Sequence, residues 1–132
     1  MAEVTVHVEA EINPTESEDK VKTAVCNVLG NASITLKPSG KASTLMAEAK
    51  GQDSLFKLRT ILRTDRIRDA ARKALFHSLR GNTICFCLNK QVAFAGHVSF
   101  SEETAESPLG PIRVIIESDN PEQLIEWLAE KT

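Results

Sequence analysis

The 132-residue chain is long enough to bury one hydrophobic core, and its length favours one domain over two. It is 42% hydrophobic and 26% charged with a net charge of −2, a composition typical of globular proteins that argues against a disordered chain. Because neither a long apolar run nor a secretory leader pattern is present, we expect a cytoplasmic domain over residues 1–132 that spans no membrane.

The first segments show a strand pattern and then a helix pattern. Apolar and polar residues alternate over 4–12, which predicts a strand with one buried face and one solvent face. Thr15 and Glu18 have the spacing of a capping box, and apolar residues at helical spacing follow them. We therefore expect an amphipathic helix that begins near Thr15 and is closed by Gly30.

Two short strands and two helices are expected next. The strands cover 34–36 and 45–49, and the turn residues between them predict a hairpin. Apolar positions at helical spacing predict helices over 53–62 and 64–75, with Gly81 after the second. The expected caps are Asp53 or Ser54 for the first helix and Thr64 or Asp65 for the second.

The last third of the chain predicts three strands and a helix. Alternating apolar residues over 84–88 and 92–100 flank a turn near Asn89, which indicates a hairpin. A strand over 112–116 then precedes a helix that starts at Asn120. The predicted order is βαββααβββα. Since most connections join neighbouring strands without a helical crossover, we expect a single α+β domain with a largely antiparallel sheet covered by helices.

Charge is distributed unevenly along the chain. The segment 57–80 contains eight basic and two acidic residues, whereas the segment from Glu102 to the end contains eight acidic and two basic residues. We interpret the acidic stretch over 102–106 as a solvated loop rather than a cation site, because a cation needs a fixed geometry of several oxygens. The basic middle of the chain is therefore the first candidate for a binding surface.

The chain resembles a family of small, uncharacterised archaeal proteins described as predicted RNA-binding. The resemblance runs in order through the stretches INPTESEDKV, LRTILRTDRIRDAARKAL, GNTICFCLNKQVAFAGHVSF and ESPLGPIRVIIES. It implies an α+β fold similar to that of the ribosomal protein that holds 5S rRNA in the large subunit, and it implies homodimers. It supplies no catalytic residues, and a shared fold alone does not establish function.

The basic segment carries the candidate RNA site. At 100° per residue, Arg66, Lys73, His77 and Arg80 form one stripe on the second predicted helix of the segment. Aromatic rings among cations suit single-stranded RNA, since bases stack on rings while guanidinium groups hold the backbone. The predicted RNA-binding residues are Arg59, Arg63, Arg66, Arg72, Lys73, Phe76 and Arg80.

A structural interpretation of the same residues stays open. Asp69 lies three or four residues from several of the cations, so part of the stripe can be a solvated face with internal ion pairs. Phe56 and Phe76 lie on the polar sides of their helices, where second-face packing or contacts between subunits explain such rings equally well.

The cysteines and histidines give no support for catalysis or for a metal. Cys26, Cys85 and Cys87 are expected to be free thiols, and the last two to be buried small side chains on one strand rather than zinc ligands. His7 and His97 are expected on the polar sides of strands, without an oriented partner and nucleophile. We expect no enzyme activity and no cofactor.

The sequence thus predicts an RNA-binding or ribonucleoprotein-associated protein that acts through its basic helical segment. The alternative is a protein-interaction module, in which the basic helix of one subunit meets the acidic carboxyl-terminal half of another in a homodimer. An enzyme acting on a small anionic substrate comes third.

Overall fold

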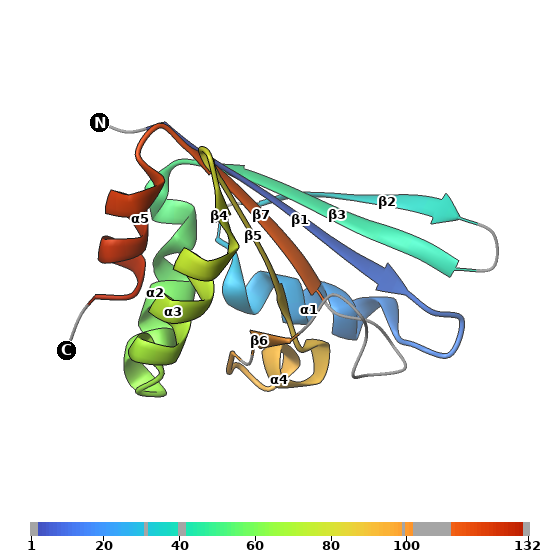
Figure 1. Cartoon of the computed structure of the whole chain (residues 1–132). Helices are drawn as coiled ribbons and strands as arrows, with labels where there is room; N and C mark the ends of the chain where they lie inside the picture. The colour runs from blue at the N-terminus through green and yellow to red at the C-terminus, as the bar shows by residue number, and fades with distance from the viewer. Residues whose placement is uncertain (1–2, 31, 40–41, 99, 102–111, 131–132) are drawn as a thin grey trace.

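The computed structural model describes residues 3–30, 32–39, 42–98, 100–101 and 112–130; the predicted acidic loop over 102–106 lies outside them. In these residues a seven-stranded sheet carries all of the helices on one side (Figure 1). The predicted α+β class with an antiparallel sheet is confirmed. No helix of the described residues is long and apolar enough to cross a membrane.

The described strands and helices have the following bounds. The strands are β1 (Val4–Ile12), β2 (Ser33–Ser39), β3 (Ala42–Lys50), β4 (Leu79–Arg80), β5 (Thr83–Leu88), β6 (Phe100–Ser101) and β7 (Ile112–Ser118). The helices are α1 (Glu18–Val28), α2 (Phe56–Thr64), α3 (Arg68–Ser78), α4 (Lys90–Phe94) and α5 (Pro121–Leu128), with a 3-10 turn η1 (Gln52–Leu55) before α2.

The sheet has the order β2-β3-β1-β7-β5-β4, and β6 pairs with β5. Every pairing is antiparallel. In the middle of the sheet Val6 lies opposite Ala49 on one side and Ile116 on the other, and all three are buried. The alternation predicted over 4–12 is confirmed, because the apolar residues of β1 lie in the core while their polar neighbours face away from the helices.

The predicted hairpin and one of the predicted helix caps are confirmed, whereas the predicted capping box is not. Strands β2 and β3 form the predicted hairpin, and the Asn120 side chain caps α5 by accepting a hydrogen bond from the backbone N–H of Gln123. The prediction of a capping box at the start of α1 is wrong. The helix begins at Glu18, and the carboxylate of Glu16 instead accepts a hydrogen bond from the backbone N–H of Asn13.

The strand predicted over 92–100 is also wrong, because the chain forms α4 and then only the short strand β6. The Asn89 side chain accepts a hydrogen bond from the backbone N–H of Val92, an interaction that starts a helical turn. Helical rotation then buries Ala93 and turns Phe94 outward, where 44% of it is exposed. A strand β4, paired with β5 across a two-residue turn at Gly81, is likewise absent from the predicted order.

A buried ion pair attaches α4 to the rest of the molecule. Lys90 is only 5% exposed, and its ammonium group donates to the carbonyl of Glu11 in β1 and to Oε1 of Glu16 at 2.9 Å. Burial acts to raise the pKa of Glu16, but hydrogen bonds from the Asn13 backbone and from Lys90 outweigh it, so the pKa lies below its ordinary value. The Glu16 carboxyl is therefore ionised across the neutral range.

We predict that Glu16→Gln destabilises the fold by about 3 kcal/mol near neutral pH, because the buried Lys90 charge loses its counter-ion. The folded pKa of Glu16 is depressed, so its contribution is complete above the unfolded pKa near 4.5 and is lost as pH falls through the folded value. Denaturant unfolding of both proteins across this range measures the difference. Glu18→Gln, at an exposed position of α1, is the matched control, and a difference that stays constant into acid contradicts the assignment.

Candidate nucleic-acid interface

Helix α5 holds two of the predicted RNA-binding arginines. Arg59 donates from Nε to the carbonyl of Trp127 at 3.0 Å and from Nη2 to Glu130 at 3.2 Å. Arg72 binds both carboxylate oxygens of Glu126, one of them at 2.6 Å. Two-point binding of a carboxylate by a guanidinium is strong and fixes its direction. The basic segment and the acidic end of the chain therefore meet within one molecule at these two positions.

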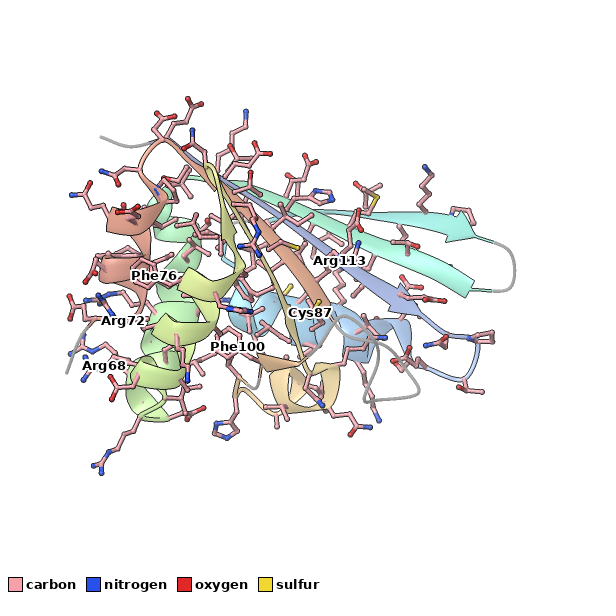
Figure 2. All side chains as sticks on the ribbon, viewed as in Figure 1. Arg68, Arg72, Phe76, Cys87, Phe100 and Arg113 are labelled. Atoms are coloured by element: carbon pink, nitrogen blue, oxygen red, sulfur yellow. The ribbon has the colours of Figure 1, made fainter. Side chains whose placement is uncertain are left out.

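Phe76 lies beside the ion pair between Arg72 and Glu126. The residue is 36% exposed, and the guanidinium carbon of Arg72 lies 5.2 Å from the ring centroid, within the range of a cation–π contact. The hydrogen bond to Glu126 raises the pKa of Arg72 above its ordinary value. Figure 2 shows Arg68, Arg72 and Phe76 following one another along one side of α3, as their spacing of four residues requires.

The predicted stripe on the second helix is not continuous. Arg66 lies before α3 with a φ of 56°, in the left-handed region, and neither Thr64 nor Asp65 caps that helix, which begins after Ile67. Arg80 lies in β4, where its guanidinium donates to the carbonyls of His77 and Leu79. Of the stripe, only Lys73 and His77 belong to α3, and both are exposed.

Three arginines gather instead around the turn between α2 and α3, and we name them the basic corner: Arg63, Arg66 and Arg68. Arg63 lies one helical turn after Arg59 on α2, and Arg68 lies one turn before Arg72 on α3. Each therefore lies on the same side of its helix as the arginine that is paired with a carboxylate, one turn nearer to the α2–α3 turn. Arg63 and Arg66 are exposed and Arg68 is partly exposed. Arg68 is not among the predicted RNA-binding residues, although its four-residue spacing from Arg72 places it on the same side of the helix.

A polar contact places the basic corner beside the segment after α4. Nδ1 of His97 lies 2.9 Å from the carboxylate of Asp65, which belongs to the same turn as Arg66. His97 follows α4 outside any strand, so its predicted place on a strand is wrong, whereas His7 does lie on β1, between Glu9 and Glu48. The α2–α3 turn and α4 emerge at the same end of the helical layer (Figure 1).

The thiols differ in burial. Cys87 is buried as predicted, but Cys85 is exposed, although both lie on the face of β5 opposite to the core residues Ile84 and Phe86. In the described residues all three cysteines are free, and no group of three His, Cys, Asp or Glu side chains is placed to hold a metal ion.

Comparisons with known proteins agree on one family. A family model with the description "RNA binding" matches residues 5–118. A UPF0201 protein of Sulfurisphaera tokodaii is 46% identical over 95% of this chain and 86% of its own length, and one of Saccharolobus solfataricus is 41% identical over 98% and 89%. The crystal structure of a UPF0201 protein from Methanococcus jannaschii superposes with a TM-score of 0.84 at 32% identity, covering 97% of this chain and 94% of that one. The likeness to the 5S rRNA-binding ribosomal protein stays a prediction.

We predict that Phe76→Ala lowers the free energy of unfolding by about 1–3 kcal/mol, because it removes a partly buried ring and its contact with Arg72. Thermal melting measures this loss. Phe76→Leu, which keeps apolar volume without the aromatic face, should recover part of it. An unchanged melting temperature for the alanine variant would mean that the ring is free for an external partner.

Proposed function

The chain belongs to the archaeal UPF0201 proteins and to the family described as RNA binding, and from this premise we propose that it binds single-stranded RNA at the basic corner. The observation that carries the proposal is the position of Arg63, Arg66 and Arg68 around one turn. They lie one helical turn beyond the arginines whose charges face Glu126 and Glu130. Guanidinium groups in such a cluster suit phosphate oxygens, which they bind with directed hydrogen bonds.

The other predicted residues take different parts in this proposal. Lys73 and Arg80 are exposed and extend the positive surface along α3 and β4. Arg59 and Arg72 hold α5 in place and contribute less to RNA, because their charges already face carboxylates. The proposed RNA contact is thereby narrowed from the whole basic segment to the turn between α2 and α3 within it.

We propose binding rather than catalysis, without a cofactor. A general base needs a reacting group or nucleophile within hydrogen-bond reach. Among the described residues, His7 contacts Glu9 and Glu48, and His97 contacts Asp65. These contacts orient the rings but bring no hydroxyl or thiol to them.

We predict that RNA affinity falls with salt and that replacing Arg63 and Arg66 together with alanine flattens this dependence. Each phosphate contact with a single strand adds about −0.7 to the slope of log affinity against log salt, so the double variant should lose about 1.4 from the slope. Fluorescence anisotropy with a labelled oligonucleotide at several salt concentrations gives both slopes.

The matched control replaces Lys37 and Lys50, two exposed lysines of β2 and β3, with alanine. This control removes the same charge from strands on the other side of the molecule and should leave the slope unchanged. Equal slopes for the wild type and the Arg63 and Arg66 variant would place the RNA elsewhere, and a wild type that binds no RNA would end the proposal.

A homodimer is a second candidate function, favoured by the apolar surface around Trp127. Phe56 is 53% exposed although its ring meets Trp127 edge to face with centroids 5.4 Å apart, so part of an aromatic pair faces outward. Such a pair can pack against its copy across a two-fold axis.

We predict two copies in sedimentation equilibrium and a weaker dimer for Phe56→Ser, whereas a wild-type monomer at high micromolar concentration would contradict this candidate.

A further inference from the structure

A cavity of about 400 Å³ lies between the start of α1 and α4, and none of the residues that line it belongs to the basic corner. Its size falls within the range of ligand pockets. Its lining combines apolar residues, among them Val21 and Phe94, with polar and charged ones, among them Glu16, Lys20 and Lys90. A surface that combines an apolar wall with several polar groups is suited to a flat, polar-edged molecule.

Phe94 is the exposed ring of this cavity. It is 44% exposed, and Nζ of Lys20 lies 5.8 Å from its centroid. Asn27 donates to the carbonyls of Ala93 and Phe94 at 2.9 and 3.2 Å, which holds the end of α4 against α1 and fixes the base of the ring. A fixed aromatic ring beside a cation is the arrangement with which proteins stack an unpaired base and hold its phosphate.

The cavity also contains a directed acceptor. The Oε1 atom of Glu16 accepts hydrogen bonds from the backbone and side-chain N–H groups of Asn13 and from the ammonium of Lys90. Its Oε2 accepts a longer bond from Lys90, at 3.2 Å, and a carboxylate oxygen has two lone-pair directions. An exocyclic amino group can therefore donate to this oxygen.

The segment after α4 connects the cavity with the basic corner. Phe94 of the cavity ends α4, and His97, three residues later, contacts Asp65 in the α2–α3 turn. A strand of RNA whose phosphates lie on the basic corner can follow this segment to the cavity over several nucleotides.

We infer that the cavity between α1 and α4 binds one unpaired base of the RNA strand, stacked on Phe94 with its phosphate near Lys20. The inference rests on the proposed RNA-binding function. It assigns base preference to Glu16, whose acceptor favours adenine, cytosine or guanine, which carry an amino group, over uracil, which does not.

The test measures binding of an oligoadenylate of about 12 nucleotides, a length within the range of single-strand sites, to the wild type and to Phe94→Ala. Loss of one stacked base should weaken binding about 5- to 100-fold. With 2-aminopurine in the oligonucleotide, its fluorescence should fall on binding to the wild type and fall less with the variant. Oligouridylate should bind the wild type more weakly than oligoadenylate.

The matched control is Leu36→Ala, which truncates an exposed apolar side chain on β2, and melting curves verify that both variants fold. Equal RNA affinity of the wild type and folded Phe94→Ala overturns the inference and leaves the proposed function intact. Should the alanine variant fail to fold, Phe94→Leu and Lys20→Ala answer the same question, and full affinity in both overturns the inference. A wild type that binds no RNA removes the function and the inference together.

Discussion

Burial of one face of the antiparallel sheet determines where everything else in the molecule lies. Alternate residues of the central strands, among them Val6 and Ile116, point into a single core, so the helices must cover that face. The opposite face keeps polar groups such as His7 between two glutamates. With every helix on one face, the turns between helices emerge at the ends of one layer, and this geometry brings the α2–α3 turn and α4 to the same end.

Within the described residues, the carboxyl-terminal segment determines which arginines of the basic segment are paired with carboxylates and which are not. Glu126 of α5 binds Arg72 of α3, and Glu130, just after α5, binds Arg59 of α2, so α5 is attached to both helices. The arginines one turn further along keep their charge facing outward. A chain with a net charge of −2 can in this way still present a local cluster of cations.

The sequence predicted most of the fold, because its strongest signals are periodic. The alternation of β1 and the Asn120 cap of α5 required no distant contact to be interpreted. The segment after β5 was misread, since Val92 and Phe94 alternate as strand residues do, while the decisive interactions are the Asn89 cap and the burial of Lys90 against β1. The second of these depends on tertiary structure and has no signature in a local window.

The sequence could predict which segment is rich in basic residues, but it could not predict how those residues are arranged in space. Residue counts identified the basic segment, and a helical projection then placed Arg66 and Arg80 on one helix that includes neither. The interruption at Arg66, where the backbone is left-handed, turns a presumed stripe into a corner. The cavity beside Phe94 could not be predicted from the sequence, because it forms only where α4 packs on α1.

The central place of β1 has a consequence for how the chain reaches its native state. The first strand needs β7 as a neighbour, and Val4 pairs with Ser118, more than a hundred residues further along. Contacts so distant in sequence slow folding, because a long loop must close before they form. During synthesis the backbone groups of β1 on the side of β7 therefore stay unpaired until β7 leaves the ribosome, and such an edge beside an apolar face exposes the nascent chain to aggregation.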